Sequence, residues 1–153
     1  MIEMTLVGIP VIFILITTFE VARAMWIYHT LAHAVKEGSR YASVHGSNCA
    51  APPNACTVDI AQIAARIRSA GVGLIPEELQ LSFTAANGVE TRCLLRSCLT
   101  NSTTWPPSPA NGVGSHITIS GSYPFRSPVA LLWQRDAAAV IHFPASSQER
   151  IRF

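Results

Sequence analysis

The sequence predicts an α+β protein in which a long N-terminal α-helix, apolar over its first half, packs on a small antiparallel β-sheet head with one short extra helix. Two observations predict this class. Apolar residues follow helical spacing through the first third of the chain, and from Leu79 onward apolar and polar residues alternate with the period of strands. The composition changes at Gly46, so we expect a helical segment at 1–45 and a globular head at 46–153.

The segment 4–19 (MTLVGIPVIFILITTF) is apolar except for its threonines and is bounded by Glu3 and Glu20. At about 1.5 Å per residue it covers roughly 24 Å, against the roughly 30 Å of a hydrocarbon core. Continuing the span to Ala22, with Arg23 reaching toward the interface, supplies the difference. We therefore expect a membrane-spanning segment, with interfacial aromatic residues following it.

A secretory signal peptide is the alternative, since Ala22-Arg23-Ala24 has the form of a cleavage site. Two features disfavour it: the apolar run is preceded by no Lys or Arg, and helical spacing crosses the site without a break. That spacing predicts one stripe, formed by Val21, Met25, Tyr28, Ala32, Val35, Ser39 and Ala42. Of these residues we expect Met25, Tyr28, Ala32, Val35 and Ala42 to pack on the head.

Gly8 and Pro10 predict a local break in this helix. Pro10 cannot donate a hydrogen bond to the carbonyl of Leu6, and glycine lowers helix propensity by about 1 kcal/mol. A mild kink is the alternative.

The motifs Phe-Glu-Val-Ala-Arg-Ala-Met-Trp-Ile-Tyr at 19–28 and Ala-Val-Lys-Glu-Gly-Ser-Arg-Tyr-Ala-Ser-Val at 34–44 resemble the TadE-like family of pilin-related proteins, with weaker similarity at 117–132 and none over roughly 46–115. The resemblance implies a pilin-like fold, insertion in the bacterial inner membrane, a prepilin peptidase that removes a leader, and pilus assembly machinery as partners. It also implies an assembly role for a glutamate near the mature N-terminus. Glu3 matches by residue type but lies closer to residue 1 than the position usual in pilins, so we expect the sequence to begin near the mature end or at a misplaced start.

The resemblance alone would favour a minor pilin, but we expect a structural subunit that polymerises with itself into an extracellular filament at the cell surface. Glu3, Gly8 and Pro10 are the expected assembly residues. The expected filament-core residues are Val11, Phe13, Leu15 and Phe19. The alternative is a minor pilin or a single-span anchored module that initiates or tips a pilus. We favour the filament subunit, because an apolar terminal helix is ordered most readily when copies of itself surround it.

Composition limits the other function classes. Only 13% of the residues are charged and 49% are hydrophobic, which is typical of an anchored subunit and unusual for a free soluble domain. The 11 basic and 9 acidic residues form no basic run, so nucleic-acid binding is not indicated.

The four cysteines form two close pairs, Cys49/Cys56 and Cys93/Cys98, which read as disulfides. Three pairings are possible and we favour the local one, in which each pair closes a short loop. Zinc is the rival, although these spacings without paired histidines are poor for a structural site. The sequence carries no motif for covalent haem attachment, and we expect no cofactor and no metal.

In the head, Ile60, Ile63, Ala64 and Ile67 predict a short helix that ends near Gly71 or Gly73 and is capped by Thr57 or Asp59. A hairpin follows, with strands at 79–83 and 89–95 and a turn at Asn87-Gly88. We expect an exposed loop at 100–115, strands at 116–123 and 138–143, a helical turn at 128–134 and an edge strand at 150–153.

Catalytic constellations are absent from the sequence. No carboxylates are paired for acid–base work, and there is no nucleophile elbow or phosphate-binding loop, so we expect no enzyme. His29 and His33 share one helix face but lack a third ligand, so we read them as an ordinary surface or packing face. Glu20 with Arg23 and Glu37 with Arg40 predict surface ion pairs worth a few tenths of a kcal/mol. Asn101-Ser102-Thr103 matches a glycosylation sequon, which we read as a plain loop.

Overall fold

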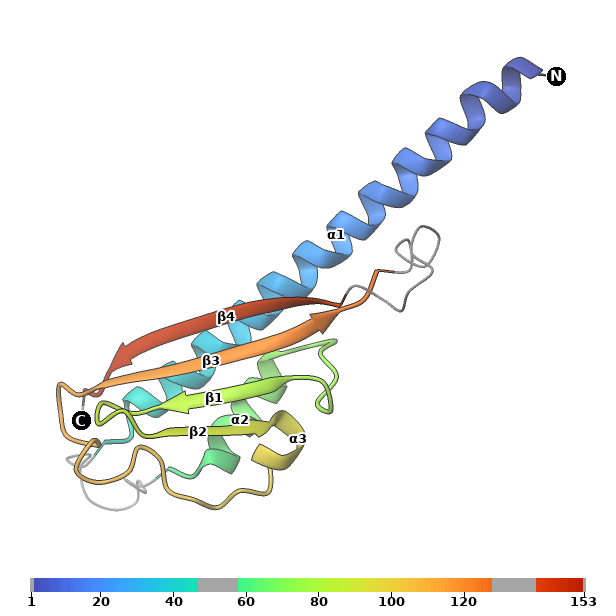
Figure 1. The fold of residues 1–153 in the computed structure, drawn as a ribbon. Helices are drawn as coiled ribbons and strands as arrows, with labels where there is room; N and C mark the ends of the chain where they lie inside the picture. Colours follow the sequence, from blue (N-terminus) through green and yellow to red (C-terminus); the bar gives the residue numbers. More distant parts are fainter. Residues whose placement is uncertain (1, 47–57, 128–139, 153) are drawn as a thin grey trace.

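A computed structural model describes residues 2–46, 58–127 and 140–152 of the 153-residue chain. A long helix runs along one side of a four-stranded sheet and continues far beyond it (Figure 1). The predicted α+β class is confirmed: a long N-terminal helix that is apolar in its first half, a small antiparallel sheet and a short extra helix.

Helix α1 (Ile2–Ser43) is 42 residues long, which corresponds to about 63 Å. It runs through Gly8 and Pro10 without interruption, so the break predicted there is not present in the single chain. The physical reason is that proline removes one hydrogen bond, whereas helix propagation on both sides adds one bond for each residue fixed.

The second half of α1 packs on the head, as expected, through a face that includes Leu31, Ala34, Val35, Ser39 and Ala42, all fully buried. Buried Ser39 is satisfied, because its hydroxyl lies 2.9 Å from the carbonyl oxygen of Lys36 and 2.7 Å from the hydroxyl of Ser147.

The predicted packing stripe is correct near its C-terminal end and wrong at its start. Met25 is 53% exposed, and Ile27 packs against the core in its place. Ala32 is half-buried, and Tyr28 is 43% exposed although its ring meets the edge of Phe143 at 6.3 Å. Alternating steps of four and three average 3.5 residues, so the stripe drifts by about 20° per heptad around a straight helix. Three heptads separate Ala42 from Val21, and the drift of about 60° carries the start of the stripe away from the head.

Helix α2 (Ile60–Ala70) confirms the predicted short helix and buries Ile60, Ile63, Ala64 and Ile67. It crosses α1 at Gly38, which is buried. A Cβ atom at Gly38 would lie only 2.5 Å from Cγ1 of Ile67, so the two helices approach as closely as they do because residue 38 has no side chain.

The sheet contains β1 (Gln80–Thr84), β2 (Glu90–Leu94), β3 (His116–Phe125) and β4 (Ile141–Arg150) in the order β2-β1-β3-β4, with every neighbouring pair antiparallel. The β1–β2 hairpin and the strand starting at residue 116 confirm the predictions. The turn between β1 and β2 contains Gly88 at φ 80°, a conformation that favours glycine.

Strand β4 corrects the prediction for the C-terminal region. One strand pairs with β3 over its whole length, where the sequence suggested two strands at 138–143 and 150–153. Of the residues that face the helices, Phe143 is large and apolar, but Ala145, Ser147 and Glu149 are small or polar, so the alternation was weak in the sequence. Pro144 is tolerated because β4 is an edge strand. The predicted helical turn at 128–134 lies outside the described residues.

The segment between β2 and β3 also differs from expectation. It begins with a short helix, α3 (Leu95–Cys98), that the sequence did not predict. The loop at 100–115 was expected to be exposed, yet Trp105 is only 2% exposed and stacks edge-on against Phe83 at 5.5 Å. This loop therefore supplies part of the core.

The core lies between one sheet face and the two longer helices. Leu81 and Phe83 from β1 and Ile117 and Ile119 from β3 are fully buried there. Gly121 brings β3 close to α1, since a Cβ atom at this position would lie 3.0 Å from Val35. The opposite face of the sheet carries polar side chains, among them Ser82, Thr84, Ser120, Ser122 and Ser146.

Candidate functional site

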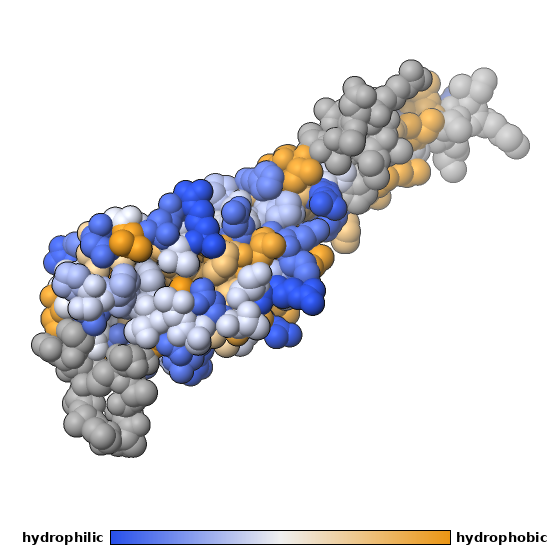
Figure 2. All heavy atoms as spheres, turned by 60° about the horizontal axis from the view of Figure 1, so that its bottom comes forward, coloured by the Kyte–Doolittle hydropathy of each residue, from blue (hydrophilic) through white to orange (hydrophobic). Residues whose placement is uncertain are grey.

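The first half of α1 is the largest apolar surface that the described chain leaves uncovered. Its large apolar side chains are 41–72% exposed, and the helix contains an 18-residue window of mean hydropathy 1.9 with none of that window buried. In Figure 2, apolar side chains gather on the projecting helix, whereas the visible part of the head is mainly hydrophilic with scattered apolar spots. By length and composition this helix can cross a membrane.

The four residues expected in a filament core all lie on this uncovered segment. Their exposed fractions are 47% for Val11, 43% for Phe13, 64% for Leu15 and 72% for Phe19. Val11, Leu15 and Phe19 share one face of the helix, and Phe13 lies on the opposite side. Together with the other exposed apolar side chains between Leu6 and Ile16 they cover the whole circumference, which is typical of a segment that an apolar environment surrounds.

The three residues expected to act in assembly lie toward the beginning of α1. Glu3 is exposed in the first turn, and no heavy atom lies within 4 Å of the position that a Cβ atom would occupy on Gly8. The next basic side chain along the helix is Arg23, which lies about 30 Å away at 1.5 Å per residue. Within its own helix, Glu3 therefore has no cation that can reach it.

A cluster that we call the helix–head junction forms where α1 meets the end of β3; its residues are Glu20, Arg23, Phe125, Arg126 and Ser127. The Ser127 hydroxyl donates to Oε2 of Glu20 at 3.0 Å, and Arg23 lies 3.6 Å from Oε1 of the same carboxylate. The Arg23 guanidinium also stacks 5.2 Å from the centre of the Phe125 ring and donates to the Arg126 carbonyl at 3.4 Å.

The junction contains more than the sequence predicted. The Glu20–Arg23 ion pair was expected on the surface, but the Glu20 side chain is only 15% exposed. Its partner Ser127 lies 107 residues away, and no local pattern points to that contact. The second expected pair, Arg40 with Glu37, is exposed and spans 3.4 Å.

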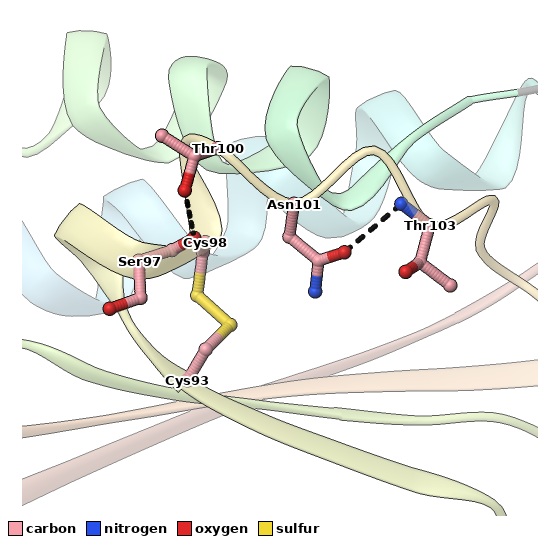
Figure 3. Close-up of a disulfide and its surroundings, with 6 residues drawn as sticks. All are labelled: Cys93, Ser97, Cys98, Thr100, Asn101 and Thr103. Atoms are coloured by element: carbon pink, nitrogen blue, oxygen red, sulfur yellow. Dashed lines mark hydrogen bonds between the residues drawn. A yellow bond between two sulfur atoms is a disulfide. The ribbon is translucent and has the colours of Figure 1, made fainter.

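The disulfide between Cys93 and Cys98 joins β2 to α3, with the two Cα atoms 5.6 Å apart (Figure 3). It is the local pairing that the spacing favours. Cys49 and Cys56 lie outside the described residues. Asn101 follows α3, and its side-chain oxygen accepts a hydrogen bond from the Thr103 backbone at 3.0 Å, which shapes the loop at the sequon.

The open face of the sheet forms a shallow trough of about 470 Å³, and five of its twelve lining residues carry short hydroxyl side chains. At its edge, Arg92 donates two hydrogen bonds to Glu90 at 2.8 and 2.9 Å, and these bonds, with a further one from Ser82, hold the pKa of Glu90 below its usual value. The carboxylate is thus paired with a neighbouring cation and open to solvent, unlike a buried general acid or base.

The histidine pair on α1 gains no further ligand in the described part of the chain. His29 and His33 are both exposed, and a search of the described residues finds no cluster of three His, Cys, Asp or Glu side chains suited to a metal ion.

Comparison with known protein families gives a match that falls on helix α1. Residues 1–40 match the family model described as TadE-like protein. This segment is similar to the TadE-like family. The recognition made from the two sequence motifs is confirmed for this segment, which spans about a quarter of the chain, whereas the similarity suggested at 117–132 lies outside the match. No curated protein and no solved structure shows a significant match to the chain.

The TadE-like segment includes both the uncovered half of α1 and most of its packing face, up to Arg40. Glu20, Arg23 and Gly38 all lie inside the match, whereas their partners on the head lie outside it. The match supports a pilus-associated, pilin-like protein of a structural family, held at a membrane by its N-terminal helix.

Proposed function

We propose that this protein is a pilin-like structural subunit that polymerises through its N-terminal helices into a pilus filament at the cell surface. The observation that carries the proposal is the apolar half of α1, which projects from a folded head with its side chains uncovered. Such a surface needs an apolar environment, because each large apolar side chain left in water costs about 1.5–3 kcal/mol relative to burial.

The same apolar surface is surrounded by two environments in succession, the membrane and the filament. It first spans the inner membrane, where lipid tails surround it, and it then leaves the membrane to pack among copies of itself. Lipid tails are as apolar as leucine, so this transfer changes the hydrophobic free energy little. Close packing of Val11, Phe13, Leu15 and Phe19, together with a paired charge, must supply the preference for the filament.

Glu3 provides that charge. Inside a filament core its carboxylate loses water, and an ionised residue in an apolar span costs about 2.5–3.5 kcal/mol. Because Arg23 is about 30 Å away on the same helix, the partner that we propose is a cation of a neighbouring subunit. A bare carboxylate at a helix N-terminus would gain only about 0.3–1 kcal/mol from the helix dipole.

The experiment is Glu3→Gln in cells that assemble the filament, with the yield measured by electron microscopy of sheared surface material. We expect normal membrane levels and a folded head but few or no filaments. The matched control is Glu37→Gln, which removes an exposed carboxylate from the same helix, outside the apolar half, and should leave the yield unchanged. Undiminished filament yield from Glu3→Gln would contradict the assembly role.

The second candidate is a minor pilin, or a single-span module that initiates or tips a pilus made of another subunit. It is favoured by the length of α1, which suffices for a membrane anchor without any polymerisation. Abundance separates the two: a filament subunit dominates sheared surface material, and a minor pilin is scarce in it. Prepilin peptidase and the pilus assembly machinery are the further partners that we propose for either candidate.

A further inference from the structure

The length of the apolar segment fixes how far α1 can lift the head from a bilayer. A hydrocarbon core of roughly 30 Å requires about 20 helical residues. Counted from Glu3, the first polar side chain after residue 1, these residues extend to Ala22. The headgroup layer of roughly 5–7 Å then corresponds to the next turn of helix, which contains Arg23 and Trp26. Trp26 is 66% exposed, as suits an interfacial aromatic residue.

The head begins at the same level of the helix. Ser127 bonds to Glu20 at 3.0 Å, and Phe125 stacks on Arg23 at 5.2 Å. The helix therefore offers no spacer between the end of the span and the first contact with the head. If Glu3 to Ala22 occupy the hydrocarbon core, the end of β3 is forced into the headgroup layer.

Exposed apolar side chains occupy this end of the head. Ile141 is 53% exposed and pairs with Phe125, and its neighbour Val140 is 37% exposed. In the loop between α2 and β1, Val72 is 68% and Ile75 is 49% exposed. The backbone N–H of Ile75 donates to the Tyr123 hydroxyl at 3.4 Å, which fixes this loop beside the end of β3. Figure 1 shows this loop and the adjoining ends of β3 and β4 at the end of the head from which α1 projects.

Three ion pairs lie at this end among the residues that the structure describes. Besides Glu20 with Arg23, Arg126 lies 3.8 Å from Glu78, and Arg96 lies 3.4 Å from Glu77. These three ion pairs contribute no net charge, so they give this end of the head no electrostatic preference between a zwitterionic and a mixed phospholipid surface.

We propose that this end of the head, which we name the membrane-facing end and define by Val72, Ile75, Phe125–Ser127, Val140 and Ile141, rests in the phospholipid headgroup layer before assembly. Val140 and Ile141 enter the boundary between headgroups and acyl chains, beside Trp26. The inference rests on the membrane stage of the proposed function, and it adds a second contact with the bilayer that lies on the head and outside the TadE-like segment. The contact fixes the tilt and rotation of the head in the membrane.

The experiment places a fluorescent thiol label at single introduced cysteines in the full chain, reconstituted in phosphatidylcholine vesicles. Labelling without reductant preserves the Cys93–Cys98 disulfide, and the unsubstituted chain serves as the blank. Quenching is measured with nitroxides on the lipid headgroup and, separately, deep in the acyl chain. Ile141→Cys is compared with Val113→Cys, which has the same exposed fraction of 53% but lies at the opposite end of β3, where Gly114 bonds to Ile151.

We expect headgroup nitroxides to quench the label at Ile141 at least about twofold more than the label at Val113, since only the former lies within the roughly 5–7 Å headgroup layer. Val72→Cys repeats the measurement at a second position of the membrane-facing end. The pairing of charges predicts that the difference persists at high salt.

A label at Leu15→Cys separates the two hypotheses. If the acyl-chain nitroxide fails to quench it, the helix does not span the bilayer, and the membrane stage of the proposed function is wrong. If Leu15 is quenched while Ile141 and Val72 behave like Val113, insertion holds and the contact of the head with the membrane is overturned. If the label at Ile141 changes only as protein density in the vesicle rises, without nitroxide quenching, this face meets a second copy, which also overturns the proposal.

Discussion

Gly38 is the position where a single methyl group should test how the helix is attached to the head. In a helix interior, Gly→Ala ordinarily stabilises by about 1 kcal/mol, because alanine restricts the unfolded chain and favours helix. At Gly38 the new Cβ atom would lie 2.5 Å from Cγ1 and 2.8 Å from Cδ1 of Ile67, which is fully buried and has no solvent to move into. The structure therefore predicts the opposite sign.

The magnitude follows from the two opposing effects. Overpacking a tightly packed core costs about 1–3 kcal/mol, and contacts this short belong to the upper part of that range. Subtracting about 1 kcal/mol of helix propensity leaves a net destabilisation of about 1–2 kcal/mol. With a dependence on urea of about 1–3 kcal/mol per molar, the unfolding midpoint of the head should fall by roughly 0.3–2 M.

The assay is urea unfolding of the full chain in detergent micelles, followed by fluorescence of the buried Trp105 against the other tryptophans. Gly8→Ala is the matched control: it makes the same change on the same helix, but nothing lies within 4 Å of the new methyl group, so the midpoint of the head should not move. In an Ile67→Ala background the clash is removed, and Gly38→Ala should then stabilise.

An unchanged or higher midpoint for Gly38→Ala in the natural background would refute the close crossing of α1 and α2. Destabilisation of equal size in the Ile67→Ala background would refute the assignment of the cost to that contact.

Three further predictions concern other parts of the molecule. Replacing Cys93 and Cys98 together by serine should lower the unfolding free energy of the head by about 2 kcal/mol, from the closure entropy of so short a loop, and leave helix association intact; urea unfolding and cross-linking check these outcomes. Because Arg92 and Ser82 lower the pKa of Glu90 in the folded head, their contacts stabilise the head at pH values above the carboxyl's unfolded pKa, and this stabilisation is lost as the pH falls through the lowered folded pKa. Glu90→Gln should remove that part of the acid dependence, and a midpoint-versus-pH profile identical to that of the natural chain would contradict the contact. In an assembled filament, α1 should lose helical hydrogen bonding near Gly8 and Pro10, and a filament map showing continuous helix from Leu6 to Ile14, apart from the bond that proline cannot make, would refute this.

The sequence predicted the elements whose signal is local. The apolar segment, the helix at Ile60–Ala70 and the hairpin around Gly88 each carry periodicity or turn chemistry within a dozen residues. The same holds for the motifs that identified residues 1–40 as TadE-like.

What the sequence could not predict depends on residues far apart in the chain. Ser127 donates a hydrogen bond to Glu20, which lies 107 residues away in the chain, and Ser147 is hydrogen-bonded to Ser39, which lies 108 residues away. Trp105 is buried although its neighbours are typical of an exposed loop, because Phe83 on β1 lies against it. In β4, small residues on the inner face hid the alternation that marks a half-buried strand.

These distant contacts determine how helix and head act together. The head contacts α1 over five turns of the helix, from Glu20 to Gly38. The contacts along this stretch are Glu20 with Ser127, Arg23 with Phe125, Tyr28 with Phe143, and Gly38 with Ile67. Contacts so widely spaced prevent the head from rotating about the helix or sliding along it, because any such movement would have to break them together. The orientation of the apolar half, whether set by a bilayer or by neighbouring helices, is consequently passed to the head as a rigid unit. In the filament that we propose, regular packing of the helices would therefore be sufficient to place the heads regularly on the surface, without a separate contact between heads.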